Sequence, residues 1–247
     1  MSKALSYEVR GGNGARNLVL VHGAGADRSH WPQELAELPG YNVYFLDLPG
    51  HGRAGGRGRT SVAGYAESMA DFIENLGLTE VTLCGHSMGG AVGLALALAH
   101  PAWLQALILV GSGSRLKVTP ALLEQLERDY TAAVDTLCQA LFGPTASPDM
   151  VAAERQRYLA ADWRLVRDDL LACNAFDVTD RLSEIDLPTL VVNGDADVMT
   201  PVKYAQFLKG SIAGARLTLI AGAGHMVAKE KPIEFTRVIK SFLATLP

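Results

Sequence analysis

The stretch VTLCGHSMGG at residues 81–90 decides the fold of this chain of 247 residues. It reads as a buried apolar strand, a tight Gly-x-Ser-x-Gly turn around Ser87, and the start of a helix. Gly85 and Gly89 lack side chains that would collide across the turn, so the Ser87 hydroxyl can stand clear of the sheet edge. A helix beginning at Met88 would direct its N-terminal N–H groups at the same place. A serine displayed in this way indicates nucleophilic chemistry.

Other short apolar runs lie on both sides of this stretch, and glycine-rich turns follow them. Apolar character that is continuous rather than alternating is typical of strands covered on both faces. These runs are Leu18–Val21, Val43–Leu46, Ala106–Val110, Leu190–Val192 and Leu217–Ile220. Helical patterns such as Ser61–Leu76 and Met88–His100 alternate with them, which predicts an α/β fold with a mostly parallel sheet flanked by helices. The segment Leu5–Arg10 reads as an edge strand that ends in a hairpin turn at Gly11–Gly14.

The alternation of strands and helices stops between residues 114 and 186. Apolar residues from Leu122 to Leu141 are three or four positions apart, which predicts one face of a long helix. A second helical stretch runs from about Tyr158 to Leu170. We therefore expect one core domain, made of residues 1–113 and 187–247, that is interrupted by a helical insertion at residues 114–186.

A serine hydroxyl is a weak nucleophile and needs a base. Of the six histidines, His225 directly follows the last apolar run, which places it at the sheet edge that carries Ser87. The chain order of serine, acid and histidine favours His225 as the base. The acid should follow a strand between them, and segment 194–197 offers Asp195 and Asp197. A turn needs a few residues before it can project a side chain toward His225, which favours Asp197, although spacing alone does not separate the two.

An oxyanion forms when a serine attacks a carbonyl, and it needs two backbone N–H donors. Met88, the residue after the predicted nucleophile, is expected to supply one of them. The other is expected from Ala24 in the turn His22-Gly23-Ala24-Gly25, which follows an apolar run. The glycines on both sides of Ala24 let the backbone come close to a substrate.

Taken together, these segments resemble the α/β-hydrolase superfamily, in its single-domain esterase branch with a Ser-His-Asp triad. The resemblance rests on Val21–Gly25, Asp47–Gly52, Gly85–Gly90, Gly194–Asp197 and Gly224-His225. It implies that Asp197 rather than Asp195 is the acid, and that the insertion forms a cap over Ser87. Members with an aspartate nucleophile, the dehalogenases and epoxide hydrolases, are disfavoured because the turn holds Ser87.

Two groups of cations allow an additional interpretation. The Gly/Arg loop at residues 52–59 could grip a phosphate, but it lacks the Lys-Ser/Thr ending of a P-loop, so a solvated loop is the simpler interpretation. It also departs from the family pattern, because Ala54 stands where a small polar residue is common. Cations of the insertion could bind a carboxylate, although solvated helix faces are the favoured interpretation. They are Arg115, Lys117, Arg155, Arg157, Arg164 and Arg167.

The predicted activity is that of a serine esterase, which hydrolyses small, fairly apolar carboxylic esters through an acyl-enzyme. The same triad also serves carbon–carbon bond hydrolases, lactonases and thioesterases, and a ligand-binding receptor of this fold could retain it with slow turnover. We expect the insertion to roof the substrate pocket. The expected pocket residues are Gly25, Phe142, Trp163, Val198 and Met226.

Composition limits the partners and the compartment. Lysine and arginine total 22, against 26 aspartate and glutamate residues. The resulting net charge of −4 does not indicate the basic surface that binds nucleic acid or an anionic membrane. Cys84, Cys138 and Cys173 are odd in number and widely spaced, which predicts neither a disulfide framework nor a CxxC metal site. The expected mechanism needs no metal or cofactor, and the sequence shows no cluster of metal-ligating residues. No signal peptide is visible at residues 1–10, and the apolar runs are far shorter than the ~20 residues of a membrane span. We expect a cytoplasmic enzyme with a small-molecule substrate, in an oligomeric state that the sequence leaves open.

Overall fold

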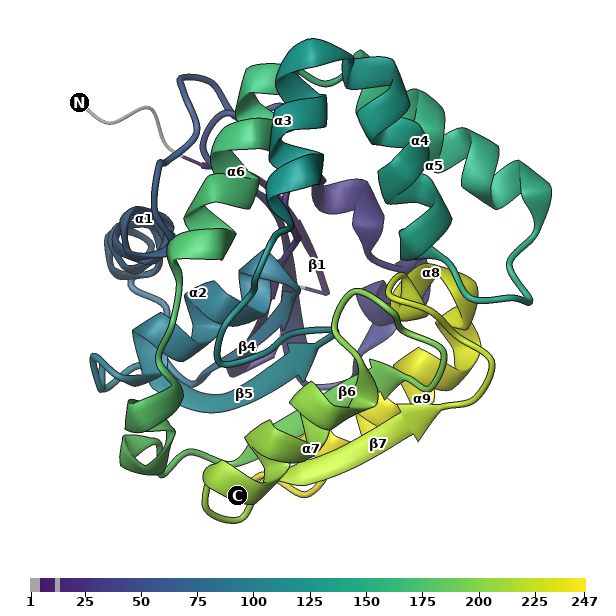
Figure 1. Ribbon diagram of the computed structural model, residues 1–247. Coiled ribbons are helices and arrows are strands. Elements are labelled where there is room, and N and C mark those ends of the chain that lie inside the picture. Colours follow the sequence, from purple (N-terminus) through teal and green to yellow (C-terminus); the bar gives the residue numbers. More distant parts are fainter. Residues whose placement is uncertain (1–4, 12–13) are drawn as a thin grey trace.

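The computed structural model describes residues 5–11 and 14–247 (Figure 1). The described residues form one seven-stranded sheet with the order β1-β3-β2-β4-β5-β6-β7. All neighbouring strands run parallel except β1 and β3. This arrangement confirms the predicted mostly parallel α/β sheet. The strands are β1 (Ser6–Arg10), β2 (Arg16–Val21), β3 (Tyr41–Asp47), β4 (Val81–His86), β5 (Leu104–Val110), β6 (Thr189–Gly194) and β7 (Arg216–Ile220).

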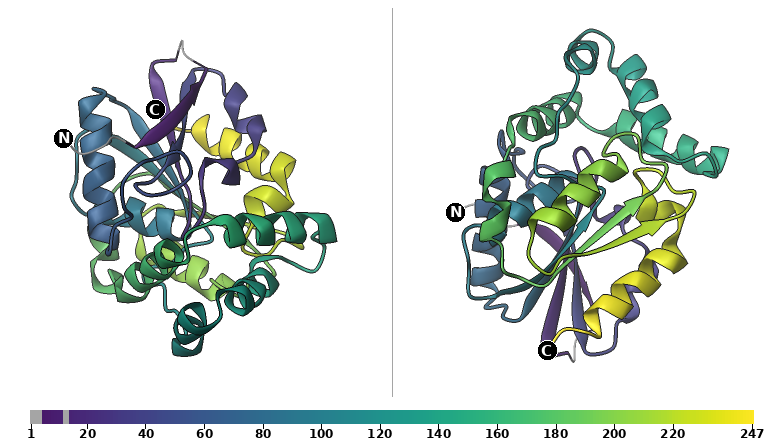
Figure 2. Two further views of the ribbon diagram at one scale, coloured as in Figure 1. Left: turned by 90° about the horizontal axis from the view of Figure 1, so that it is seen from above. Right: turned by 60° about the horizontal axis from the view of Figure 1, so that its bottom comes forward.

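Helices cover both faces of the sheet. Successive side chains of β2 point to opposite faces, so Val19 and Val21 join one apolar cluster and Leu18 and Leu20 join the other. Helices α1 (Val62–Asn75), α2 (Met88–Ala97) and α7 (Val202–Ser211) and the 3-10 helix η3 (Thr179–Glu184) contribute to the first cluster. The 3-10 helix η2 (Gln33–Glu37) and helices α8 (Val227–Glu230) and α9 (Pro232–Leu243) contribute to the second. Figure 2 shows α9 on the opposite side of the sheet from α1.

The expected N-terminal hairpin is wrong. Strand β1 pairs antiparallel with β3, from Ser6 opposite Asp47 to Arg10 opposite Val43, and not with β2, which follows it in the chain. Both edges of β2 are occupied, by β3 on one side and β4 on the other, so β1 cannot pair with β2 and instead extends the sheet beyond β3. The middle of the expected turn, Gly12 and Asn13, lies outside the described residues.

The helical insertion between β5 and β6 contains four α-helices in the described chain, besides the 3-10 helix η3. They are α3 (Pro120–Arg128), α4 (Tyr130–Leu141), α5 (Pro148–Ala160) and α6 (Trp163–Ala175). They form a separate layer, drawn in teal and green at the top of Figure 1. Their inner faces share an apolar cluster with Met226 of the core. None of the helices described in the chain combines the length and the apolar character needed to cross a bilayer.

The insertion corrects two helix predictions. The long helix expected from Leu122 to Leu141 is broken at Asp129, whose backbone leaves the helical region and whose carboxylate accepts a 3.0 Å hydrogen bond from the N–H of Ala132. The stretch from Tyr158 to Leu170 is likewise two helices, because Asp162 caps the start of α6. The apolar spacing continues across both breaks because the helices on either side bury their faces in one cluster. Periodicity alone therefore did not reveal the aspartate caps.

Candidate active site

The turn between β4 and α2 holds Ser87 in a strained backbone conformation. Its φ of 52° and ψ of −112° lie in a region that residues with a side chain rarely adopt. The two glycines of the motif are required by space. A Cβ atom on Gly85 would lie 2.2 Å from the carbonyl oxygen of Gly89, and one on Gly89 would lie 2.2 Å from that of Val21. Strand, turn and helix therefore pack too closely for any other residue at these positions.

His225 and Asp197 form a buried pair at the same edge of the sheet. The Nδ1 atom of His225 lies 2.9 Å from Oδ2 of Asp197. The Asp197 carboxylate also accepts the N–H groups of Met199 (2.8 Å) and Thr200 (2.9 Å). Burial by itself would raise the pKa of Asp197, but His225 and these donors lower it below its ordinary value. Asp197 is therefore a carboxylate that can orient the His225 ring.

Asp195, the other candidate acid, faces away from His225. Its carboxylate accepts a 2.7 Å hydrogen bond from the N–H of Gly222, and the residue is exposed. Asp195 thus ties the loop after β6 to the loop after β7, whereas Asp197 reaches the histidine.

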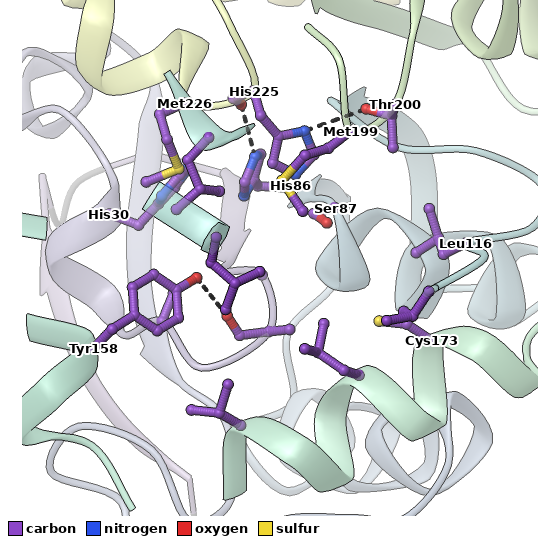
Figure 3. A pocket seen from close by; sticks show the side chains of 18 of the residues that line it. His30, His86, Ser87, Leu116, Tyr158, Cys173, Met199, Thr200, His225 and Met226 are labelled. Atoms are coloured by element: carbon purple, nitrogen blue, oxygen red, sulfur yellow. Dashed lines mark hydrogen bonds between the residues drawn. The ribbon is translucent and has the colours of Figure 1, made fainter. Parts of the chain in front are cut away.

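Ser87 and His225 line one cavity. Figure 3 shows the Ser87 side chain in this cavity, which His86, His225 and Met199 also line. Among the described residues, no hydrogen bond joins Ser87 Oγ to the ring of His225. In unliganded enzymes such contacts are often long and tighten when substrate binds. The two side chains therefore share a site in which a proton can pass from the serine to the imidazole.

The predicted oxyanion donors lie on two sides of Ser87. Met88 is the first residue of α2, and Ala24 lies in the loop after β2 and lines the cavity. This loop comes close to the serine, because a Cβ atom on Gly23 would lie 3.2 Å from Cβ of Ser87. In the described part of the chain, the N–H groups of Ala24 and Met88 donate to no protein acceptor. Both are thus available to a substrate oxygen.

The cavity is small and mostly apolar. Its volume is about 70 Å³. The helical insertion supplies much of its wall, including Leu137 and Leu141 of α4, Tyr158 of α5 and Leu170 of α6. Apolar walls with few polar groups are typical of sites for small organic ligands.

Of the five expected pocket residues, Met226 lines the cavity and the other four lie outside it. Gly25 is buried beneath Tyr158 of the cap. Trp163 packs under the guanidinium groups of its neighbours on α6, and Phe142 packs at the end of α4. Val198 is 66% exposed. These positions depend on how the cap docks onto the core, which local sequence does not specify.

Two histidines that the sequence did not assign to the site form its polar wall. The rings of His30 and His86 stack with centroids 4.2 Å apart, and both residues line the cavity. Burial lowers the pKa of His86 to about 3 and holds that of His30 well below its ordinary value, so both rings are neutral. The Nε2 atom of His86 donates to the carbonyl oxygen of His225 at 3.0 Å. The position of His86 inside the Gly-x-Ser-x-Gly turn was the signal that could have identified it.

Most cations of the insertion have protein partners. Arg155 pairs with Asp135, Arg157 with Glu154 and Arg167 with Asp168. Among the described residues that line the cavity, Lys117 is the only member of this set.

In the Gly/Arg loop, the N–H of Arg53 donates to Asp47 at 2.8 Å. The described residues hold no group of three or more His, Cys, Asp or Glu side chains placed to bind a metal ion.

Comparisons with known proteins identify the family to which the chain belongs. The sequence pattern of the alpha/beta hydrolase family matches residues 18–238. The chain is 28% identical to the pimeloyl-[acyl-carrier protein] methyl ester esterase of Serratia marcescens, over 94% of this chain and 96% of that protein. It is 30% identical, over 93% of each, to a Rhizobium rhizogenes protein whose name includes the words carbamate hydrolase.

A solved thermophilic esterase has the same architecture. It superposes with a TM-score of 0.84 at 31% identity, over 97% of this chain and 98% of that one. The match to the family pattern covers most of the chain, and it confirms the resemblance drawn from the motifs. The chain therefore belongs to the alpha/beta hydrolase family.

Proposed function

We propose that the protein is a serine esterase that hydrolyses small, fairly apolar carboxylic esters. One observation carries the proposal. Ser87 on its strained turn and His225, whose Nδ1 atom pairs with the buried Asp197, line the same cavity, whose remaining walls are largely apolar. Such a site can activate a serine and at the same time bind an acyl group.

The geometry supports a two-step acyl transfer. Ser87 Oγ attacks the ester carbonyl carbon while His225 accepts the serine proton, and the N–H groups of Ala24 and Met88 bind the oxyanion. The tetrahedral intermediate then expels the alcohol, which takes the proton from His225. A water molecule then attacks the acyl carbon and passes a proton to His225. The second tetrahedral intermediate expels Ser87 Oγ, which takes that proton back from His225 as the acid leaves. Asp197 keeps the Nδ1–H of His225 directed toward itself throughout.

The size and polarity of the cavity support short acyl chains. A volume of about 70 Å³ holds a few methylene groups rather than a long chain. Lys117 is the only Lys, Arg, Asp or Glu side chain among the described residues that line it. The esterases to which the chain is similar support ester hydrolysis as the reaction.

A panel of acyl compounds with one common acyl group tests the proposal. We would measure kcat/KM for a butyrate ester, thioester and carbamate, a small lactone and a vinylogous diketone, each with the wild-type protein and with Ser87→Ala. The proposal expects the ester to be hydrolysed with many turnovers and the variant to be inactive. Single turnover, or equal rates for both proteins, would contradict it and would favour a receptor of the same fold.

Carbamate hydrolysis is the second candidate, because one of the similar proteins is named for it. A carbamate carbonyl is attacked in the same way, but its attached nitrogen makes it less electrophilic. The panel separates the two activities directly, since a carbamatase would give a higher kcat/KM for the carbamate than for the matched ester. A preference for the lactone, the thioester or the diketone would instead assign one of the other reactions that this triad can perform.

We also propose that residues 114–186 act as the cap of the site and that the protein works in the cytoplasm. The cap assignment is supported by the four helices in this range, three of which supply walls of the cavity. The location is supported by Cys84, Cys138 and Cys173, which are free thiols, as expected in a reducing compartment.

A further inference from the structure

Side chains of the cap hold the backbone of the loop that carries Ala24. The hydroxyl of Tyr158 donates to the carbonyl oxygen of Ala24 at 3.1 Å, a contact drawn in Figure 3. The N–H of Gly25 donates to Oδ2 of Asp169 at 2.8 Å. The Ala24–Gly25 peptide unit is therefore held at both ends. A guanidinium N–H of Arg157 also donates to the carbonyl oxygen of Gly25 at 2.5 Å.

The loop and the cap are packed without space between them. Gly25 has a φ of +62°, and a Cβ atom on it would lie 2.9 Å from both Tyr158 and Val166. The loop also contains Gly23, so its own backbone resists bending only weakly. Its conformation consequently depends on the contacts that the cap makes.

Asp169 is the most deeply buried of these cap residues, with an exposed fraction of 0%. Besides the N–H of Gly25, its carboxylate accepts the hydroxyl of Tyr65 at 2.6 Å and Nε2 of His51 at 2.7 Å. Asp169 lies on α6 of the cap, whereas these three donors belong to the core. Its carboxylate is therefore a hydrogen-bonded joint between the two parts.

The charge of Asp169 is matched by His51. The Nδ1 atom of His51 lies 3.1 Å from the carbonyl oxygen of Pro49, and its Nε2 atom faces Asp169. Both partners are acceptors, so a protonated ring donates from both of its nitrogens. Burial by itself would lower the pKa of His51, but Asp169 raises it above its ordinary value. The joint is thus a buried His51–Asp169 pair in which both ring nitrogens have a partner.

We infer that Asp169 is a positioning residue for the oxyanion hole, an inference that rests on the proposed function. By holding the N–H of Gly25, it fixes the peptide unit next to the N–H of Ala24. A donor in an oxyanion hole acts only when it lies about 2.7–3.1 Å from the oxygen that becomes negative. A loop that shifted by an ångström would still admit the substrate but would bind its transition state less tightly. The cap thereby contributes to catalysis from outside the cavity.

The alternative is that Asp169 only attaches the cap to the core. The two roles differ in kinetics. A displaced oxyanion donor lowers kcat with little change in KM, because the lost contact belongs to the transition state. It also affects ordinary esters more than thionoesters, whose carbonyl sulfur accepts hydrogen bonds weakly. A loosened cap would affect both substrates equally and would raise KM.

The experiment compares Asp169→Ala with Asp169→Asn and with Asp168→Asn, on an ester and its matched thionoester. Asp168 is the matched control, because it adjoins Asp169 on α6 and pairs with Arg167 at the surface. The alanine variant should lose about 10- to 100-fold in kcat on the ester, and its KM should stay within about twofold of the wild-type value. Displacing the N–H of Ala24 should lower kcat less than removing an oxyanion donor altogether would. The preference of the alanine variant for ester over thionoester should fall at least about fivefold. Asparagine keeps an oxygen for the N–H of Gly25 and should restore most of kcat, and the Asp168 variant should match the wild type.

Equal losses on both substrates, an unchanged kcat, or an asparagine variant as impaired as the alanine variant would overturn the inference. If Asp169→Ala does not fold, Tyr158→Phe decides, because it removes the hydroxyl from the carbonyl of Ala24. Its preference for ester over thionoester should also fall, and an unchanged preference would contradict the inference. The Ser87→Ala variant is measured before any Asp169 variant. If it hydrolyses the ester as fast as the wild type, the proposed function is refuted, and not the positioning role of Asp169.

Discussion

The hydroxyl of Thr200 donates a 2.8 Å hydrogen bond to Oδ2 of Asp197, the same oxygen that faces Nδ1 of His225. Thr200 Oγ1 also lies 3.3 Å from Nδ1 of His225. The Thr200 hydroxyl and the backbone N–H groups of Met199 and Thr200 together fix the plane of the Asp197 carboxylate. The loop after β6 is therefore folded around the Asp197 carboxylate.

Replacing Asp197 with asparagine should lower kcat by about 10⁴-fold, because an amide cannot hold the required tautomer of His225. Asp195→Asn is the matched control two positions away, and its kcat should stay within a few-fold of the wild type. Steady-state hydrolysis of a nitrophenyl ester measures both variants. The opposite order of effects would mean that Asp195 is the acid.

Acid should destabilise the protein as the pH falls below about 6.5, the ordinary pKa of histidine. His22, His30 and His86 are buried, and burial lowers the pKa of each in the folded state. The unfolded chain binds protons at these rings first, so each ring lowers the free energy of unfolding by about 1.4 kcal/mol per pH unit. His51 acts in the opposite direction, because its pKa is raised in the folded state. Its contribution to stability is fully present below the unfolded pKa and is lost as the pH rises through the folded pKa.

Thermal unfolding monitored by circular dichroism checks this balance. The Tm should fall clearly between about pH 7.5 and about pH 5.5, as three buried neutral rings outweigh one cation. A Tm that stays level or rises over this interval would show that these histidines are already charged in the fold.

The acyl chain should be limited by the cavity. Each buried methylene gains about 0.8 kcal/mol, so kcat/KM should rise about three- to fourfold for each added carbon that fits. With a volume of about 70 Å³, the rise should stop at short to medium chains. A series of nitrophenyl esters from acetate to laurate measures the limit. A preference for laurate, or equal rates along the series, would show that the cap does not close a small pocket over Ser87.

Gly25→Ala should lower both stability and activity. The new Cβ atom would lie 2.9 Å from Tyr158 and Val166, and the positive φ adds strain, so a loss of about 1–3 kcal/mol in the free energy of unfolding is expected. Gly210→Ala on α7 is the control, since its Cβ atom would meet nothing within 4 Å. That change should stabilise the protein by up to about 1 kcal/mol. Chemical denaturation compares the two, and equal effects would contradict the close packing of Gly25 against the cap.

Short sequence motifs predict those parts of the site whose positions are set by neighbouring residues in the chain. The Gly-x-Ser-x-Gly turn is specified by the space between β4 and α2, and parallel strands bring the loops after β4, β6 and β7 to one edge of the sheet. The sequence could therefore predict the sheet and identify Ser87, Asp197 and His225 as candidates. Their catalytic roles are the proposal that the predictions above test.

The remaining features depend on contacts between distant segments. The partner of β1 depends on which sheet edge is free, and the break at Asp129 depends on a cap within a continuous apolar pattern. Four of the expected pocket residues lie outside the cavity, because the packing of the cap against the core determines which side chains line it. Asp169 had no local signal at all, since its donors come from segments as far as 144 positions away in the chain.

The central claim is that Ser87 is the nucleophile, and the most direct test is to locate a covalent adduct. The protein would be treated with a nitrophenyl phosphonate, which phosphonylates activated serines, and its peptides would be mapped by mass spectrometry. The account predicts one adduct, on Ser87, whose extent follows the loss of esterase activity. An adduct on another residue that accompanies the loss, or full activity with Ser87 modified, would contradict it.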